Sequence, residues 1–316
     1  MNLSFRPKQS EVEKSPEVVK RSLDSARDDR SGKLIVIVGE TASGKSALAM
    51  EVARRFNGEI ICADAMTVYK GFDIGTAKPS EKDRADVPHH LLDVADAAEG
   101  FTAAEFKQLA ERAVADISAR GKLPILVGGS GLYVDSVLYD YRFSALPNTY
   151  ERDVLNTMSL AALCDLAQQR GLDLSRVDTA NPRRVIRLIE TNGEPAKRSS
   201  LRERTCVIGL KNERALLASQ VKTRVAAMLE TGLAEEVKRL SRRYGWDCEP
   251  MKAIGYREWQ AYFEGQASLE DITARIITST MQLAKKQRTW FKRNNSIQWV
   301  TDPSSAVDIV TTFLNK

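Results

Sequence analysis

The stretch Gly39–Ser46 constrains the fold of this chain more than any other feature. It follows the pattern GxxxxGKS, the apolar run Leu34–Val38 precedes it, and a helical pattern, Lys45–Phe56, follows. Glycines in such a loop let backbone N–H groups turn toward phosphate oxygens, the helix N-terminus and the lysine add positive charge, and Ser46 offers a hydroxyl ligand for Mg²⁺. The alternative is an ordinary glycine-rich turn. We predict a site for a di- or triphosphate, built from Gly39, Thr41, Ala42, Ser43, Gly44, Lys45 and Ser46.

Length and composition indicate a soluble globular enzyme. The 316 residues suggest about two domains, or one domain with a large insertion. No run approaches 18 apolar residues, and the first residues lack the apolar core of a secretion signal, so we expect no membrane partner. The four cysteines lie far apart without CxxC spacing, which favours neither a zinc site nor a disulfide framework. We therefore expect a reducing, cytoplasmic location.

Positive charge is concentrated in two segments. The net charge of +5 is too small to indicate nucleic-acid binding by itself, and a solvated helix face is the alternative reading of each cluster. The distribution of the charge is more informative than its sum. The two clusters are Arg183, Arg184, Arg187, Lys197, Arg198, Arg202 and Arg204, and Lys285, Lys286, Arg288, Lys292 and Arg293.

Periodicity predicts alternating strands and helices in the first half of the chain. Residues 1–31 are polar and aperiodic, and we expect a disordered leader there. Strands are predicted at 34–38, 59–63 and 123–127, with helices at 45–56 and from 103 to about 120, which is the βαβ order of a parallel sheet. Beyond Tyr133 helices dominate, at roughly 150–170, 181–192, 212–243 with a break near Thr231-Gly232, and 268–293. Strand 297–300 and helix 304–314 are expected to return to the sheet.

The acid expected at the phosphate site is Asp64. An ordinary ATPase has a second apolar strand that ends in Asp, but the strand Leu123–Val127 ends in Gly128-Gly129-Ser130-Gly131. Asp64 instead closes strand 59–63, and ligands of parallel sheets bind outside the carboxyl ends of strands. Its carboxylate suits a Mg²⁺ ligand, a hydrogen-bond partner of a substrate hydroxyl or a general base, and a capping Asp is the alternative.

Two further segments have compositions that suggest a functional role. Tyr69–Pro79 mixes glycines, hydroxyls and cations, which favours a substrate loop over a structural turn. His89-His90 suggests a metal pair, but adjacent side chains point apart on an extended chain. We expect a pocket-lining or surface role for these histidines.

Motifs along most of the chain resemble the tRNA dimethylallyltransferase family. They are Gly39–Ser46, Asp64–Pro79, Val127–Tyr133, Asn181–Arg187, Gly255–Arg257 and Gln282–Trp290, in the expected order from about 34 to 300. The family transfers the dimethylallyl group of dimethylallyl diphosphate to N6 of the adenosine 3′ of the anticodon in tRNA. By this resemblance Asp64 is the base, Arg224 assists Lys45 on the diphosphate, Ser130 lies beside the reacting centre, and Mg²⁺ is the cofactor.

The resemblance also implies a set of tRNA contacts, because the target base must leave its stack to react. Cations suit RNA phosphates and Trp290 suits base stacking. The partner would be a tRNA anticodon stem-loop, and we expect a monomer. The implied contacts are Asp64, Ala65, Met66, Thr67, Ser130, Arg152, Arg183, Arg184, Arg187, Gly255, Tyr256, Arg257, Lys285, Lys286, Arg288, Trp290 and Lys292.

Three positions depart from the family pattern. Glu40 stands where proline is usual, Ala65 where serine is usual, and Thr67 where glutamine is frequent. We expect the missing hydroxyl at Ala65 to weaken a contact to the flipped base. The stretch between Glu190 and Arg214 and part of the insertion between Leu138 and Asn181 are shorter than usual, so we expect tRNA affinity or choice to differ.

We predict an α/β protein with a P-loop NTPase-like parallel-sheet core, a helical insertion and a helical C-terminal part. The predicted boundaries are 1–31 for the leader, 32–138 for the first part of the core, 139–180 for the insertion, and 181–316 for the part that completes the core and binds tRNA. Three alternatives stay open: an adenylate isopentenyltransferase acting on free AMP, ADP or ATP, a small-molecule or nucleotide kinase, and a noncatalytic RNA-binding module.

Overall fold

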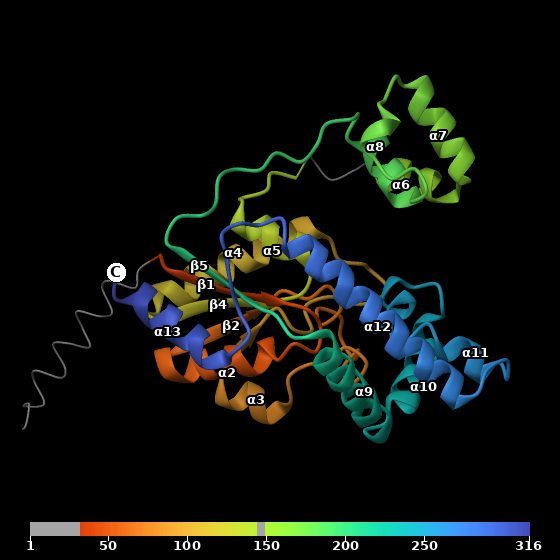
Figure 1. Ribbon diagram of the computed structural model, residues 1–316. Helices are drawn as coiled ribbons and strands as arrows, with labels where there is room; N and C mark the ends of the chain where they lie inside the picture. Colours follow the sequence, from red (N-terminus) through yellow and green to blue (C-terminus); the bar gives the residue numbers. More distant parts are fainter. Residues whose placement is uncertain (1–31, 144–148) are drawn as a thin grey trace, which may run out of the picture. The chain divides into compact units, whose positions relative to one another are not determined.

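A six-stranded parallel sheet forms the centre of the computed structural model, which describes residues 32–143 and 149–316 (Figure 1). Its strand order is β3-β2-β4-β1-β5-β6. All neighbouring pairs run parallel, so the carboxyl ends of the strands share one edge. The strands are β1 (Leu34–Gly39), β2 (Gly58–Cys62), β3 (His89–His90), β4 (Leu123–Gly128), β5 (Thr205–Leu210) and β6 (Ile297–Val300).

The central strands are apolar on both faces because helices cover both. Every residue of β1 is buried, as a parallel strand with neighbours on both sides and layers above and below requires. On one face Ile35 and Ile37 pack with α2 (Lys45–Phe56) and α13 (Pro303–Leu314). On the other face α4 (Ala103–Ala119) covers β2 and β4, and Figure 1 shows it across the sheet from α2.

A second group of helices packs against the loop that follows β2. Val68, Tyr69 and Phe72 of this loop share a core with apolar residues of these helices. The helices are α9 (Arg214–Glu230), α10 (Leu233–Tyr244), α11 (Trp259–Phe263) and α12 (Leu269–Phe291), with the short turn η2 (Glu249–Lys252) between α10 and α11. The remaining helices of the first half are α3 (Glu81–Asp86) and α5 (Gly131–Leu138).

Residues 135–202 form a compact unit separate from the one built by the described residues up to Val134 together with 203–316. The smaller unit has its own apolar core, which includes Leu163, Val185 and Ile189. Its elements are α6 (Thr149–Thr157), α7 (Leu160–Gln169), η1 (Leu174–Arg176) and α8 (Pro182–Glu190).

Most predicted elements are present, and two predictions were wrong. The break expected near Thr231-Gly232 separates α9 from α10, because Gly232 adopts a φ of 97°. The single helix expected at 150–170 is two helices, since Ser159 caps a new one. The helical reading beyond Tyr133 missed β5, a central strand that pairs with β1 along its whole length. The expected leader, residues 1–31, lies outside the described residues.

No helix within residues 32–143 and 149–316 combines the length and apolar character needed to cross a membrane.

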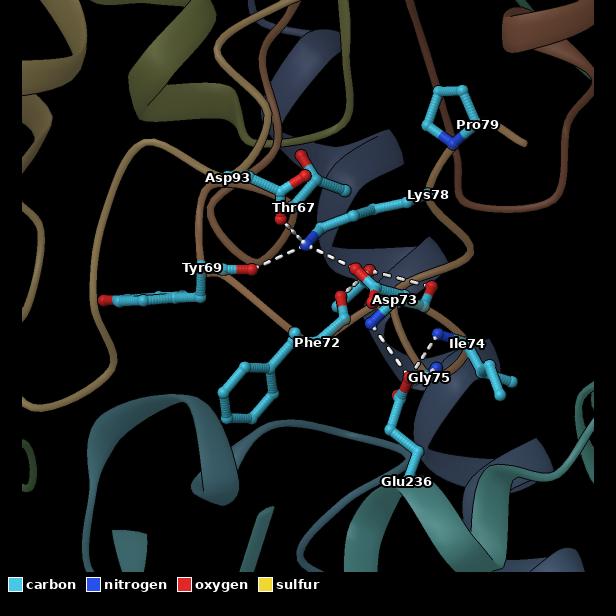
Figure 2. Close-up of polar contacts among 12 residues, drawn as sticks. Thr67, Tyr69, Phe72, Asp73, Ile74, Gly75, Lys78, Pro79, Asp93 and Glu236 are labelled. Carbon is cyan, nitrogen blue, oxygen red and sulfur yellow. Dashed lines mark hydrogen bonds and ion pairs between the residues drawn. The ribbon is translucent and has the colours of Figure 1, made fainter. Parts of the chain in front are cut away.

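A buried carboxylate holds the loop after β2 in place. Figure 2 shows Glu236 of α10 beneath three consecutive backbone N–H groups of this loop. The carboxylate accepts hydrogen bonds from the N–H groups of Asp73 at 3.1 Å, Ile74 at 2.9 Å and Gly75 at 3.1 Å. It also accepts one from the hydroxyl of Tyr256 at 2.7 Å. Four donors around one carboxylate that is only 6% exposed fix the loop more firmly than apolar packing alone.

The other end of the loop is fixed by a buried cation. The side chain of Lys78 is 1% exposed, and its ammonium donates to the carbonyl of Tyr69 at 2.6 Å and to Asp73 at 2.8 Å (Figure 2). Its third partner is Asp93, at 2.5 Å. The segment Tyr69–Pro79 is therefore held by specific side-chain contacts, which a linker would lack.

Replacing Glu236 by alanine should destabilise the protein and open this loop. The substitution leaves three N–H groups and the Tyr256 hydroxyl without their acceptor, which should cost about 2–4 kcal/mol of unfolding free energy. Denaturant unfolding measures the loss, and hydrogen exchange should be faster at the amides of 73–75. Exposed Glu235 on the same helix is the control, and its alanine variant should stay within about 0.5 kcal/mol of wild type. Equal stability of the two variants would contradict this role.

Candidate active site

The loop Gly39–Ser46 joins β1 to α2 in a strained, well-defined conformation. Gly44 has a φ of 90° and Ala42 a φ of 61°, both in the left-handed region, which is costly for alanine. α2 begins at Lys45, so the N–H groups of its first turn have no partner within the helix. These N–H groups and the helix dipole make the end of the loop a site for an anion, as the motif predicts.

Lys45 is folded back onto its own loop. Its ammonium donates to the backbone carbonyl of Glu40 at 3.0 Å. Burial, and next the neighbouring Arg224 guanidinium, lower the pKa of Lys45 to about 8, while Asp64 and Glu40 act in the opposite direction. Two cations held this close together are a receptor for a multiply charged anion.

Asp64 lies just beyond the carboxyl end of β2, where it caps the following turn. One carboxylate oxygen accepts the N–H of Met66 at 2.8 Å. Ser130, from the end of β4, accepts the N–H of Ala65 at 2.9 Å and donates its own N–H to the carbonyl of Ala63 at 3.3 Å. Capping therefore uses one oxygen of Asp64, and the residue also lines a cavity.

Arg224 of α9 approaches the same place from the helical side. It donates to the carbonyl of Thr76 at 3.3 Å, within the loop that Glu236 and Lys78 hold. Burial lowers the pKa of Arg224, and the nearby Asp64 opposes that shift. A partly buried arginine close to a carboxylate retains its charge because its ordinary pKa is very high.

Two adjoining cavities meet at these residues, and both are lined by Thr41, Asp64, Thr76 and Arg224. The first, which we call the loop cavity, has a volume of about 90 Å³ and includes Lys45 and Ser46 in its lining. The second, the helical cavity, measures about 290 Å³ and is lined largely by apolar side chains. Its apolar lining includes Met66, Val221, Val225, Met228, Ile254, Ile276 and Leu283.

The C-terminal half of α12 contacts the loop directly. Gln287 accepts the backbone N–H of Thr41 at 2.7 Å and donates to the carbonyl of Gly129 at 3.0 Å. A Cβ atom at Gly129 would lie 2.4 Å from Nε2 of Gln287, so a larger residue there would displace this amide. The backbone N–H of Thr41 is thus already engaged, although Thr41 lines both cavities.

An open groove of about 610 Å³ is lined by residues of α12, by Arg214 and Leu217 of α9, and by Glu40. Its lining includes Lys285, Arg288 and Lys292, three of the residues predicted to contact tRNA, together with Arg214. Lys285, Lys286 and Lys292 are exposed. Arg288 differs from them, because its guanidinium forms a two-pronged ion pair with Glu40.

The other predicted RNA contacts of the larger unit differ in exposure. Arg257 is exposed and lines the helical cavity, as does Gly255. Tyr256 is fully buried and packs against Gly75, so its side chain supports the loop and does not reach the surface. Trp290 packs close to Gly131, and the Arg293 guanidinium lies over its ring at 4.2 Å.

The predicted contacts of the smaller unit lie on α6 and α8. Arg183 and Arg184 are exposed at the start of α8. Arg152 and Arg187 both pair with the buried Glu190, at 2.5 and 3.4 Å.

The two adjacent histidines have separate roles, as expected from an extended chain. His89 lines the loop cavity, and burial lowers its pKa, which favours the neutral ring. His90 contacts Glu59 at 2.7 Å, away from that cavity. Within the described part of the chain, no group of three or more His, Cys, Asp or Glu residues is arranged to hold a metal ion.

Sequence reasoning gave no role to Glu236 or Gln287. Glu236 carried a usable signal, because it interrupts the buried stripe formed by Leu233, Val237 and Leu240. A charged residue on the apolar side of a helix needs a buried partner. Gln287 stands inside a quoted motif, but only the packing of α12 on the loop shows what its amide contacts.

Comparison with known proteins gives one consistent result. A family model described as IPP transferase matches residues 67–294. A tRNA dimethylallyltransferase of Anoxybacillus flavithermus is 42% identical over 278 residues, which is 84% of this chain and 89% of that one. One from Streptococcus equi subsp. zooepidemicus is 40% identical over 90% of this chain and 98% of its own.

Comparison with solved structures points to the same family. The tRNA isopentenylpyrophosphate transferase of Bacillus halodurans superposes with a TM-score of 0.69 at 34% identity, covering 90% of this chain and 97% of that one. A eukaryotic dimethylallyltransferase captured acting on tRNA gives a TM-score of 0.76 at 26% identity, covering 90% and 80%. The phosphate loop, the P-loop NTPase-like sheet and these matches together show that this chain belongs to the IPP transferase family, the tRNA dimethylallyltransferases.

Proposed function

We propose that the protein transfers the dimethylallyl group from dimethylallyl diphosphate to N6 of the adenosine 3′ of the anticodon in tRNA. The observation that carries the proposal is the shared lining of the two cavities. Asp64 and Arg224 belong to both, so a diphosphate at Lys45 and a base in the helical cavity would meet at these two side chains.

On the diphosphate side, the loop would stabilise the leaving group. The C–O bond of the allylic diphosphate breaks with its electron pair going to the diphosphate, and negative charge builds up on the bridging oxygen. The N–H groups at the start of α2 are fixed donors for such charge, and Lys45 and Arg224 are neighbouring cations that would stabilise it. Lys45 would leave the carbonyl of Glu40 for a phosphate oxygen.

On the acceptor side, Asp64 would act as a general base. The lone pair of the adenine N6 amine is delocalised into the ring, so the amine is a weak nucleophile. As the new N–C bond forms, N6 must lose one proton, and a carboxylate within reach accepts it. The hydrogen bond from Met66 orients Asp64 and leaves lone pairs for that proton.

The residues at the loop cavity fit Mg²⁺. Ser46 offers a hydroxyl, a hard oxygen donor of the kind that this ion prefers, and few protein ligands suffice because substrate phosphates and water supply the others. Bound there, Mg²⁺ would neutralise charge on the diphosphate. Ser46 would be the ligand from the loop itself.

The exposed cations support binding of the tRNA anticodon stem-loop. Lys285, Lys286 and Lys292 lie in or beside the groove along α12, and Arg183 and Arg184 are exposed on the smaller unit. Phosphate contacts from such residues position RNA without reading its sequence. A tRNA substrate and four unpaired cysteines fit the reducing cytoplasm, and we retain a monomer as the expected state.

The proposal is tested by incubating the protein with Mg²⁺, labelled dimethylallyl diphosphate and either unmodified tRNA or AMP. Digestion and mass analysis should find the N6-alkylated adenosine in tRNA only. Label in AMP would move the protein to free-nucleotide chemistry. ATP consumption without label in either acceptor would indicate a kinase.

Replacing Asp64 by asparagine should lower the single-turnover rate by about 10² or more while tRNA binding stays near wild type. Asparagine keeps an oxygen for the N–H of Met66 but cannot accept the N6 proton, so the turn should persist. Rapid quench with saturating substrates measures the rate, and exposed Asp308→Asn on α13 is the control. A variant rate within fivefold of wild type would exclude Asp64 as the base.

The pKa of Lys45 predicts how pyrophosphate binding depends on pH. A bound polyanion raises this pKa from about 8 toward the usual range, so affinity should be greatest below pH 8 and fall as pH rises through it. At pH 8.5 binding should take up roughly 0.7 proton more in wild type than in Lys45→Met. Calorimetry in buffers of different ionisation enthalpy measures the difference, and equal proton uptake by the two proteins would refute the assignment.

A further inference from the structure

A negative charge is built into the phosphate loop of this protein. Glu40 is the second residue of the loop and is only 3% exposed. Its backbone carbonyl accepts both the ammonium of Lys45 and the N–H of Ser43, at 3.0 and 3.2 Å. A buried carboxylate in a loop that binds a polyanion is unfavourable for two reasons. Its charge loses solvation when the protein folds, and it repels the negatively charged ligand.

Arg288 neutralises that charge. Its guanidinium donates through two nitrogens to the two oxygens of Glu40, one contact measuring 2.9 Å, and to the carbonyl of Asn212 at 3.4 Å. The pair raises the pKa of Arg288. Paired geometry of this kind is strong and directional, so it fixes the carboxylate as well as its charge.

Two amide side chains, those of Gln287 and Asn212, also contact the backbone of the phosphate loop. Gln287, next to Arg288, holds the N–H of Thr41. Asn212, which follows β5, donates to the carbonyl of Ser43 at 3.4 Å and to Gln220 at 2.7 Å. Glu40, Thr41 and Ser43 are thus each held by a side chain from outside the loop.

We infer that Arg288 is a positioning residue of the diphosphate site and not an RNA contact. It acts through Glu40: it cancels the charge of that carboxylate and fixes the backbone that directs Lys45. This inference rests on the proposed function only in taking a diphosphate as the ligand of the loop. It also separates Arg288 from its neighbours Lys285, Lys286 and Lys292, whose ammonium groups make no ion pair among residues 32–143 and 149–316.

The test uses inorganic pyrophosphate as the probe, measured by calorimetry at pH 7 on the whole protein. Arg288→Met leaves Glu40 charged and unpaired, and should weaken pyrophosphate binding by about tenfold or more. The double variant Glu40→Gln/Arg288→Met also removes the negative charge of Glu40. Its affinity for pyrophosphate should return to within about threefold of the wild-type affinity. Arg275→Met, an exposed arginine of the same helix, should bind pyrophosphate as wild type does.

Binding of tRNA supplies the contrasting measurement. Arg288→Met should leave the slope of log affinity against log salt unchanged, whereas Lys285→Met should reduce it by about one. The inference is overturned if Arg288→Met binds pyrophosphate normally while its salt slope flattens. It is also overturned if Glu40→Gln does not rescue Arg288→Met, because Arg288 then acts independently of Glu40.

These outcomes are separate from those of the transfer assay. Folding of each variant is checked by thermal unfolding, and the double variant covers the case in which Arg288→Met alone is unstable. Absence of dimethylallyl transfer by the wild-type protein would contradict the proposed function. The pyrophosphate series would still decide whether Arg288 acts on the loop.

Discussion

The parallel pairing of β1 with β4 on one side and β5 on the other is the constraint on which the site depends. Parallel strands bring their carboxyl ends to one edge, so the phosphate loop after β1 and the glycine-rich turn after β4 lie next to each other. Pairing of β2 with β4 adds Asp64 to the same edge. Residues about twenty to ninety positions apart in the chain become neighbours because the sheet brings them to the same edge. No direct contact between their side chains is needed for this.

Buried charges then fix the segments that the sheet leaves free. Glu236 holds the middle of the segment Tyr69–Pro79, Lys78 holds its end, and Arg288 holds Glu40 in the phosphate loop. Glu236, Lys78 and the carboxylate of Glu40 are almost removed from water, so their partners must be present and well placed. Loops are ordinarily the most mobile parts of an α/β protein. Here they carry the site because helices α10 and α12 hold them from outside the sheet.

Glu40 illustrates how a departure from the family pattern is accommodated. In place of the usual proline this chain has an acid that would repel the ligand, and α12 supplies an arginine to neutralise it. Belonging to the IPP transferase family therefore does not make every basic residue of α12 equivalent. Those pointing into solvent are suited to RNA, and the one pointing at the loop is suited to shaping the diphosphate site.

Local sequence was sufficient to predict the phosphate loop, the strand before it, the helix after it and most of the later helices. Those features depend on periodicity, caps and glycines that act over a few residues. Asp64 was found the same way, from its position at the end of a strand. Strand β5 was missed because a six-residue apolar run between charged segments has no periodicity that separates it from a buried helix.

Tertiary structure alone decided which side chains meet. Nothing in the spacing of Glu40 and Arg288, or of Glu236 and Gly75, indicates that they touch, because 248 and 161 residues separate them. Packing of α12 and α10 against the sheet-edge loops creates those contacts, and burial makes them obligatory. The sequence by itself determined which loop has the pattern of a phosphate site, and therefore the kind of ligand that we propose for it. The fold decided which of its many charges contact that loop and which remain exposed to solvent, because burial of a side chain depends on tertiary packing.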